Sequence, residues 1–429
     1  MARTADMNCG LIVSAASSGS GKTTITLGIL RALARQGTPV RAAKSGPDYI
    51  DPRFHEAACG ARCLNLDAWA MSEERLRALA AGDGLLIIEG AMGLFDGAPP
   101  RGKGATADLA RVLGLPVVLV IDAAKMAQSV APLVAGFARH DPDVRVAGVI
   151  LNQVGSSRHE AVLRRALEPL GLPVFGAVHR QTGLTHPSRH LGLVQAAERQ
   201  DLDDYLDTVA DAVSGQIDLA ALMAIAAPLP IAGTVKRMPP PAQRIAIARD
   251  QAFAFVYPHL LADWRAQGAE LSYFSPLNDE APAPADMVFL PGGYPELNAG
   301  PLAAAQKFHA GMHAAAETAM IYGECGGFMV LGKSLTDAHG MAHEMLGLLR
   351  VETSFAKPRL HLGYRRLTPL GGPFSGLING HEFHYATTLR ADGAALFNAC
   401  DAEGNTLAPM GLQDGRISGS FAHVIDQAD

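Results

Sequence analysis

The chain has few cysteines, no excess of positive charge and no long apolar run, and each of these absences excludes a class of protein. Its 429 residues include five cysteines, an odd and scattered set that does not resemble the disulfide framework of a small secreted domain. The formal net charge is −6, so no overall basic field favours nucleic acid or a membrane surface. The sequence also lacks an apolar run of about 18 residues, the length that a membrane-spanning helix needs. We therefore expect a cytoplasmic protein that binds neither nucleic acid nor membrane.

Apolar residues, by contrast, are abundant and follow a regular pattern. They make up 48% of the chain, against 18% charged residues, which is typical of well-packed globular domains. In the first half, short apolar runs alternate with longer amphipathic segments such as 22–36 and 128–139. This alternation predicts an α/β fold with a mostly parallel sheet that is covered on both faces. The runs that we interpret as strands are GLIVSAA, VRAAK, LLIIEG, PVVLVID, VAGVILN and PVFGAV.

A change of composition near residue 226 divides the chain. The segment AAPLPIAGTVKRMPPPAQ is rich in proline and alanine and shows no periodicity, as is typical of a linker. A second α/β series then begins with RIAIARD, MVFLPGG and AMIYGEC, and it is followed by a more β-rich end. We therefore predict a first domain over 1–225, a linker over 226–243 and a second domain over 244–429.

The segment SAASSGSGKTT follows a predicted strand and opens a predicted helix, which is the context of a phosphate-binding P-loop. Lys22 is expected to reach the β- and γ-phosphates of a nucleotide and the Thr23 hydroxyl to help bind Mg²⁺. Ala16 departs from the motif, which usually begins with glycine. Asn152, at the end of the run VAGVILN, could contact adenine or form a turn. The loop residues that we predict to bind nucleotide are Ser18, Gly19, Ser20, Gly21, Lys22, Thr23 and Thr24.

Acidic residues follow two other predicted strands. Lys44, Asp48 and Asp51 lie in AKSGPDYIDP, and Glu89 ends the run LLIIE before a glycine-rich loop. Ligands of open α/β sheets bind beyond the carboxyl ends of the strands, where a phosphoryl-transfer enzyme needs carboxylates. We predict that Asp48, Asp51 and Glu89 are catalytic, that Asp48 and Glu89 share Mg²⁺ with Thr23, and that Lys44 contacts the nucleotide. Turn formation beside the neighbouring prolines is the alternative for the two aspartates.

A lone cysteine in the second half lies between glycines. Cys325 in GECGG has the G-x-nucleophile-x-G form that exposes a side chain on a tight strand-to-helix turn. A base is also required, and His423 in SGSFAHVID is our candidate. The glycines of FLPGGYPE allow close approach of backbone to a substrate, so the N–H groups of Gly292, Gly293 and Gly326 could form an oxyanion hole. A buried, inert thiol is the alternative for Cys325.

Together these segments resemble the cobyrinic acid a,c-diamide synthase family, whose members in aerobic pathways act on hydrogenobyrinic acid. The resemblance covers nearly the whole chain. It implies a dethiobiotin-synthetase-like ATP domain followed by a class I glutamine amidotransferase domain of the cobyrinate type. The segments that carry it are KSGPDYIDP, EGAMGLFDG, PSRHLGLV, ARDQAFAFVYP, FLPGGYPE, YGECGGFMVLG and GHEFHY, in addition to the phosphate loop.

The resemblance also implies a reaction. Cys325, activated by His423, would hydrolyse glutamine, and the first domain would transfer the γ-phosphoryl group of ATP, with Mg²⁺, to a corrinoid carboxylate. Ammonia would then displace phosphate and leave a carboxamide, at the c and then the a acetate side chain. Many class I glutaminases have a glutamate two residues after the histidine, but Ile425 occupies that position here and Asp426 comes one residue later. We therefore expect a cysteine–histidine pair without an adjacent carboxylate.

A polycarboxylate substrate needs local positive charge, which could come from basic residues in three segments. Solvated surface is the alternative for each of them. A separate motif, HEFHY, could suggest a metal site. His381 and His384 are three residues apart, however, so on a strand they face opposite sides, and contacts with glutamine or between domains are the favoured interpretation. The substrate-binding candidates are Arg189, His190, Arg365 and Arg366, and further basic candidates are Arg101, Lys103, Lys357 and Arg359.

Two other functions stay open from the sequence. A cobyric acid synthase would amidate other carboxylates of a later corrinoid. A ParA-like positioning ATPase could use a non-catalytic glutaminase fold as a scaffold, although the intact cysteine and histidine argue against it. The sequence does not decide between a cobalt-containing and a metal-free substrate, and it leaves a homodimer open.

Overall fold

The computed structural model describes residues 8–181, 183–184, 195–231 and 233–428. The contacts between residues divide the chain into two compact units, which we call unit 1 (Met1–Val235) and unit 2 (Lys236–Asp429). The division falls inside the segment 226–243 that the composition marks as a linker. Both units combine helices with a mainly parallel sheet, so the predicted α/β class is confirmed.

Unit 1 is built on one sheet with the strand order β3-β2-β4-β1-β5-β6-β7. Neighbours along this path are parallel, and β8 adds an antiparallel pairing to β1. All six strands predicted for the first half occur, and the short β3 was not predicted. The strands are β1 (Cys9–Ala15), β2 (Val40–Ser45), β3 (Leu64–Leu66), β4 (Leu85–Glu89), β5 (Val117–Asp122), β6 (Val146–Val154), β7 (Val174–His179) and β8 (Ala227–Pro228).

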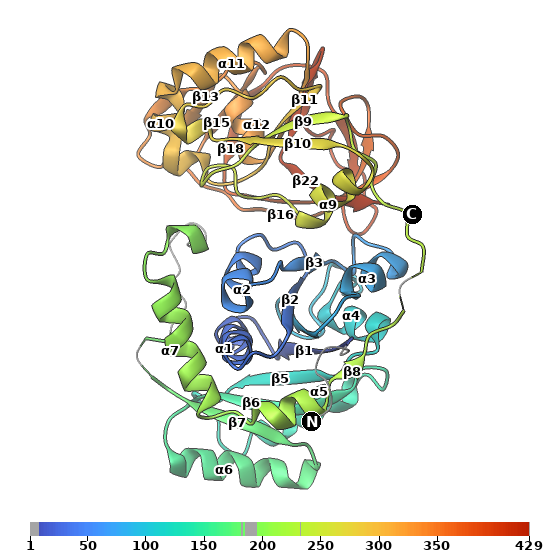
Figure 1. Cartoon of the computed structure of the whole chain (residues 1–429), viewed down its shortest axis with the longest axis vertical. Coiled ribbons are helices and arrows are strands. Elements are labelled where there is room, and N and C mark those ends of the chain that lie inside the picture. The colour runs from blue at the N-terminus through green and yellow to red at the C-terminus, as the bar shows by residue number, and fades with distance from the viewer. Residues whose placement is uncertain (1–7, 182, 185–194, 232, 429) are drawn as a thin grey trace. The chain divides into compact units, whose positions relative to one another are not determined.

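Helices cover both faces of this sheet, as the nearly all-buried strands require. Figure 1 shows α1, α2 and α7 together on one side, with α1 packed along α7, and α3 beside α4. Right-handed crossovers account for this division, because the chain moves one way along the sheet after β1 and the other way after β3. The helices are α1 (Lys22–Arg35), α2 (Asp51–Cys59), α3 (Glu73–Ala80), α4 (Thr106–Leu113), α5 (Val130–His140), α6 (Ser157–Leu167), α7 (Leu202–Ser214) and α8 (Leu219–Ala224), with short 3₁₀ turns η2 (Glu168–Leu170) and η3 (Ala196–Glu198).

This topology favours ligand binding where the strand order reverses. From β1 the chain continues to β2 and β3 on one side of the sheet. It then returns through β4 and continues to β5 on the other side of β1, so the strand order reverses around β1 and β4. Ligands of open α/β sheets bind beyond the carboxyl ends of the strands at such a point. Glu89 ends β4, and the segment between β1 and α1 contains the glycine-rich loop.

Unit 2 contains a six-stranded sheet of order β10-β9-β11-β12-β21-β20, parallel except for the β20–β21 pair. Its strands are β9 (Arg244–Ala248), β10 (Glu270–Phe274), β11 (Met287–Leu290), β12 (Met320–Glu324), β20 (Leu412–Asp414) and β21 (Ile417–Ser420). The helical elements of this unit are α9 (Pro258–Ala266), η4 (Pro276–Asn278), η5 (Pro295–Asn298), α10 (Ala299–Ala304), α11 (Gln306–Ala316) and α12 (Gly326–Leu331).

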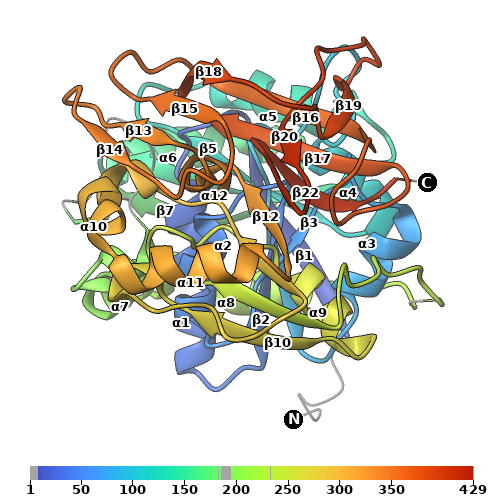
Figure 2. The ribbon, with the colours of Figure 1, turned by 90° about the horizontal axis from the view of Figure 1, so that it is seen from above.

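Two smaller sheets form the β-rich end that the sequence predicted. The first has the order β14-β13-β15-β18, and the second is antiparallel with the order β19-β16-β17-β22. Figure 2 shows β16, β17 and β22 side by side. Their strands are β13 (Ser334–Thr336), β14 (Ala342–Glu344), β15 (Val351–Ser354), β16 (His361–Pro369), β17 (Ile378–His384), β18 (Thr387–Ala391), β19 (Phe397–Cys400) and β22 (Ala422–Gln427). Over the described residues, no helix has the length and apolar character needed to cross a membrane.

Candidate active sites

The glycine-rich loop of unit 1 has a backbone that suits its predicted role. Gly19 and Gly21 adopt φ values of 79° and 85°, a region that favours glycine, and α1 begins at the next residue, Lys22. The side chain of Asn152 donates from Nδ2 to the Ser20 carbonyl oxygen at 2.9 Å. A Cβ atom at Gly21 would overlap this amide, so glycine is required there for close packing as well as for its conformation. Asn152 therefore braces the loop, and its predicted contact with adenine stays a prediction.

Lys22 lies beside the loop that it follows. Its Nζ donates to the Met92 carbonyl oxygen at 2.6 Å and lies 3.4 Å from the Ser17 carbonyl oxygen, and the residue is buried. Burial lowers the pKa of Lys22, and the nearby Glu89 charge opposes this shift. Neither carbonyl oxygen carries a net charge, so these two contacts do not neutralise the ammonium of Lys22, which suits a phosphate-binding lysine.

Three charged residues form a buried cluster beside the start of α1. Lys44 Nζ donates to Glu89 Oε1 at 2.7 Å and to Asp51 Oδ2 at 2.6 Å. The Thr23 hydroxyl donates to the same Glu89 oxygen at 2.7 Å and lies 3.4 Å from Asp51 Oδ2. Burial alone would raise the pKa of Glu89, but Lys44 and His55 hold it well below its usual range. Glu89 is therefore ionised, although it is fully buried.

Asp48 lies at the edge of this cluster and not in its centre. Its Oδ1 accepts from the backbone N–H of Ile50 at 2.7 Å and of Asp51 at 3.2 Å, so the turn-forming alternative describes that oxygen. Its Oδ2 lies 3.9 Å from Lys44 Nζ. Burial and the Asp51 charge raise the pKa of Asp48. The carboxylate next to Thr23, beside Glu89, is thus that of Asp51 rather than that of Asp48.

The donor atoms of this cluster fit Mg²⁺. Thr23, Asp51 and Glu89 offer one hydroxyl and two carboxylates, all hard oxygen ligands of the kind that magnesium binds together with substrate phosphates. The Lys44 ammonium is paired with both carboxylates and offsets one of their two negative charges. A bound cation would share them with this ammonium.

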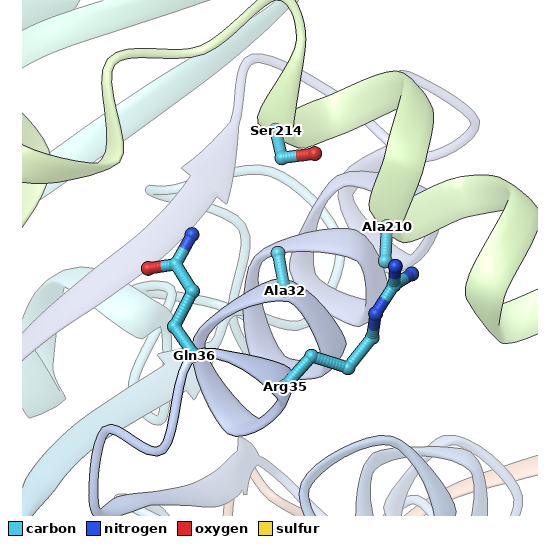
Figure 3. Close-up of a pocket in the computed structure, with 5 residues that line it drawn as sticks. All are labelled: Ala32, Arg35, Gln36, Ala210 and Ser214. Atoms are coloured by element: carbon cyan, nitrogen blue, oxygen red, sulfur yellow. The ribbon is translucent and has the colours of Figure 1, made fainter.

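A small pocket elsewhere in unit 1 does not belong to the predicted nucleotide site. Figure 3 shows it between α1 and α7, lined by Ala32, Arg35, Gln36, Ala210 and Ser214. It lies at the C-terminal end of α1, whereas the glycine-rich loop precedes the N-terminal end. A helix of 14 residues is roughly 21 Å long, so the two are well separated.

In unit 2, Cys325 stands at the strand-to-helix turn that its glycines predicted. It follows the last residue of β12 and precedes α12, with φ 46° and ψ −102°. Sparsely populated backbone conformations of this kind cost of order 1–3 kcal/mol and cluster at functional sites. The thiol is buried, and its Sγ lies 3.9 Å from the carbonyl oxygen of Phe383. This strained, glycine-flanked geometry supports the nucleophile interpretation over the inert one.

The three glycines predicted to form an oxyanion hole lie around this cysteine. A Cβ at Gly292 would be 3.3 Å from Cys325 Cβ and would overlap the His423 ring, and a Cβ at Gly326 would be 3.0 Å from the Gly293 nitrogen. The Gly292 carbonyl accepts from Phe255 N at 2.9 Å. Because N–H and C=O of one peptide point in opposite directions, the Gly293 N–H points away from Phe255. Gly326 is the first residue of α12, so its N–H has no acceptor inside the helix.

His423 is placed beside Cys325 from β22, and the structure adds a carboxylate that the sequence reasoning missed. Glu324 Oε2 lies 3.5 Å from His423 Nδ1, and Glu324 Oε1 accepts from Val424 N at 3.1 Å. Burial would lower the pKa of His423, but Cys325 and Glu324 raise it to about 10. The expectation of a cysteine–histidine pair without an adjacent carboxylate is therefore wrong.

The reason for the error is positional. The residues after the histidine contain a different carboxylate, Asp426, which pairs with Asn379 beyond a β-bulge and accepts from the Gln427 N–H at 2.9 Å. Glu324 instead directly precedes the nucleophile, as the last residue of β12. At this position β12 is paired with β21. The only sequence signal for it was a glutamate directly before the cysteine in GECGG.

Comparisons with known proteins match each of the two units to a family model. Residues 11–194 match the family model described as CobQ/CobB/MinD/ParA nucleotide binding domain. Residues 244–429 match the model described as CobB/CobQ-like glutamine amidotransferase domain. The first model also covers positioning ATPases, so full-length relatives are needed to separate these families.

Such relatives exist. A hydrogenobyrinate a,c-diamide synthase of Brucella anthropi is 55% identical over 97% of this chain and 98% of its own length. The chain belongs to the hydrogenobyrinate a,c-diamide synthase family. Proteins with the same name from a Sinorhizobium species (54% identical, 98% of this chain and 99% of the relative) and from Rhodobacter capsulatus (53%, 97% and 98%) are similar along nearly their whole length.

One predicted corrinoid-binding residue, Arg365, forms a salt bridge within the protein. Arg365 donates from Nε and Nη2 to Glu382 Oε2 at 2.9 and 2.7 Å, and 14% of its side chain is exposed. Glu382 Oε1 also lies 3.0 Å from His384 Nε2. Arg365 is thus not a free cation for a substrate carboxylate. The sequence could not reveal this, because Arg365 and Glu382 are 17 residues apart and meet only across paired strands.

His361, Glu382 and His384 bring three potential metal-ligating atoms within 4.8 Å of one another, which the HEFHY motif had raised as a question. The two imidazole rings, however, are stacked with centroids 4.6 Å apart and an interplanar angle of 4°. Glu382 is already neutralised by Arg365. Glu382 thus already pairs with Arg365 of β16 and His384 of β17.

The structure describes some of the remaining basic candidates and not others. Arg189 and His190 lie outside the described residues. The others are exposed to solvent and are available to an anionic ligand: Arg101, Lys103, Lys357, Arg359 and Arg366.

Proposed function

We propose that the chain uses ATP and glutamine to convert the a and c acetate carboxylates of hydrogenobyrinate to carboxamides. The relatives named above carry this substrate in their names, which favours the metal-free corrinoid over a cobalt-containing one. The observation that carries the proposal is the glutamate–histidine–cysteine arrangement at Cys325 in the same chain as a phosphate loop.

Unit 2 would release ammonia from glutamine. His423 accepts the proton of Cys325, whose sulfur attacks the amide carbon, while the N–H groups of Gly293 and Gly326 stabilise the oxyanion. His423 returns the proton to the leaving ammonia, and a thioester remains. Water then hydrolyses this thioester to glutamate. Glu324 fixes the orientation of His423 by facing Nδ1, which leaves the other nitrogen toward Cys325.

Unit 1 would activate the substrate carboxylate. The glycine-rich loop and Lys22 bind the phosphates of ATP, with Thr23, Asp51 and Glu89 as the residues that would hold Mg²⁺. The cation would neutralise charge on the β- and γ-phosphates during transfer. The γ-phosphoryl group passes to a carboxylate oxygen, ADP leaves, and ammonia displaces phosphate from the acyl phosphate. One glutamine, one ATP and one water are consumed for each carboxamide.

Basic surface residues could guide the polycarboxylate to this site. Arg101 and Lys103 are exposed in the loop that follows β4, the strand that ends at Glu89. They are the candidates from unit 1 that the structure describes.

The test is an incubation of the purified chain with hydrogenobyrinate, ATP, Mg²⁺ and glutamine labelled with ¹⁵N in its amide. Mass spectrometry should find two labelled nitrogens in the product, with one ADP formed for each. Cobyrinate in a parallel reaction measures the preference for the metal-free ring. Incorporation of more than two nitrogens would favour a cobyric acid synthase, and none at all would refute the proposal.

A further inference from the structure

Glu89 has a third partner that the proposed reaction does not use. His55 Nε2 lies 2.6 Å from Glu89 Oε2, the oxygen that neither Lys44 nor Thr23 contacts. His55 and Glu89 are both completely buried. His55 comes four positions after Asp51 on α2, so both side chains lie on one face of the helix. Neighbouring turns of α2 thus supply Asp51 to Lys44 and His55 to Glu89.

The other nitrogen of the His55 ring faces a thiol. Cys63 Sγ lies 3.8 Å from His55 Nδ1 and 4.0 Å from the Leu64 carbonyl oxygen. Burial raises the pKa of the Cys63 thiol well above its usual value, so the sulfur keeps its proton. A protonated thiol can donate a weak hydrogen bond to a ring nitrogen that carries no hydrogen. If Nδ1 carried the hydrogen instead, its N–H would face the Cys63 sulfur, which is a poor acceptor. Glu89 Oε2 would then face the lone pair of Nε2 at 2.6 Å.

From this geometry we propose that His55 is a positioning residue for the ATP site, held in one tautomer by Cys63. Cys63 S–H donates to Nδ1, and Nε2–H donates to Glu89 Oε2, which fixes the Glu89 carboxylate so that Oε1 faces Thr23. Hydrogen-bond partners of metal-ligating carboxylates orient them and raise affinity for the ion, typically by about 10- to 100-fold. The inference rests on the proposed role of Glu89 in binding Mg²⁺.

The test compares His55→Asn with His55→Gln in the full chain. The glutamine amide extends to about the position of Nε2 and can donate to Glu89, whereas the shorter asparagine amide reaches only to about Nδ1. Mn²⁺, followed by its electron paramagnetic resonance signal, is titrated into each protein with a non-hydrolysable ATP analogue. We expect His55→Asn to weaken Mn²⁺ binding at least about tenfold and His55→Gln to stay within about threefold of the wild type. Glutamine hydrolysis and thermal unfolding serve as checks that both variants fold.

A second readout addresses the thiol without any metal. In protein labelled with ¹⁵N in histidine, the His55 signals, assigned by their loss in His55→Asn, should report hydrogen on Nε2 and none on Nδ1. Cys63→Ala should shift this tautomer balance, and Cys63→Ser, which keeps a donor, should restore it. A ring that carries hydrogen on Nδ1 in the wild type would overturn the assignment.

The possible failures are distinguishable. If the wild type itself binds no Mn²⁺ with the nucleotide analogue, the proposed ATP chemistry is wrong. If the wild type binds Mn²⁺ and folded His55→Asn binds it equally well, the chemistry stands and the positioning role is refuted. Equal weakening in both His55 variants would mean that the shape of the ring, and not its N–H group, is what the site needs, which also contradicts the inference.

Discussion

Replacement of Glu324 by glutamine tests the carboxylate that the sequence reasoning missed. Glu324 Oε2 and His423 Nδ1 are 3.5 Å apart, and their side chains are 5% and 2% exposed. At an effective dielectric constant of about 20, two unit charges at this distance attract each other by roughly 5 kcal/mol. The imidazolium that forms when His423 takes the proton of Cys325 would lose this attraction. The amide would also present an N–H group to Nδ1 and favour the wrong tautomer.

We therefore expect Glu324→Gln to lower kcat for glutamine hydrolysis by roughly 10³-fold, since part of the 5 kcal/mol is recovered when the site relaxes. The glutamine carbonyl can still accept from the Val424 N–H, so the fold should hold. The matched control is Asp426→Asn, which changes a buried carboxylate three residues from His423 and should cost less than about tenfold, or roughly 1.4 kcal/mol. Glutaminase assays of both variants decide the matter. Near-normal activity in Glu324→Gln, with a loss of several orders of magnitude in Asp426→Asn, would refute the reasoning.

Three further predictions follow from the described contacts. Lys22→Ala should abolish amidation with either glutamine or ammonia while glutamine hydrolysis continues; amide formation by this variant would exclude the phosphate-loop assignment. Gly292→Ala should stop glutamine hydrolysis because its Cβ would overlap the His423 ring, whereas Gly300→Ala, where the nearest atom would be 3.9 Å away, should remain active. Burial would raise the pKa of Glu382, but His384 and Arg365 lower it from 4.5 to about 2, so this carboxylate stabilises the fold above about pH 4.5 and loses that effect as the pH falls toward 2. Denaturant unfolding of Glu382→Gln should accordingly show a deficit against wild type at pH 6 that shrinks near pH 2; a constant deficit would contradict the shift.

Patterns among neighbouring residues predicted several strands and the turn at Cys325. The apolar runs predicted the central strands of unit 1, and the glycines around Cys325 predicted its turn, because period and backbone freedom are properties of neighbouring residues. The three-residue β3 is too short to show a period. The runs RIAIARD, MVFLPGG and AMIYGEC likewise correspond to β9, β11 and β12.

The residues that were missed or misjudged depend on contacts between distant strands. Glu324 meets His423 because β12 and β22 converge, 99 residues apart in the chain, and no spacing rule encodes that approach. Arg365 looked like a free cation until β17 placed Glu382 beside it. His55 could have been found from its spacing of four residues after Asp51, but that spacing alone does not say that Glu89 lies on the same side.

The account rests on a division of labour between two sites in one chain. Cys325→Ala removes the thiol but leaves the Lys22, Thr23, Asp51 and Glu89 arrangement of unit 1 untouched. The decisive measurement is therefore amide formation on hydrogenobyrinate by folded Cys325→Ala, with ATP and either glutamine or a high concentration of ammonium at a pH that maintains free ammonia. We predict no product with glutamine, and product with ammonia accompanied by ADP. Glutamine-dependent product from this variant, or failure of ammonia to restore amidation, would contradict the account.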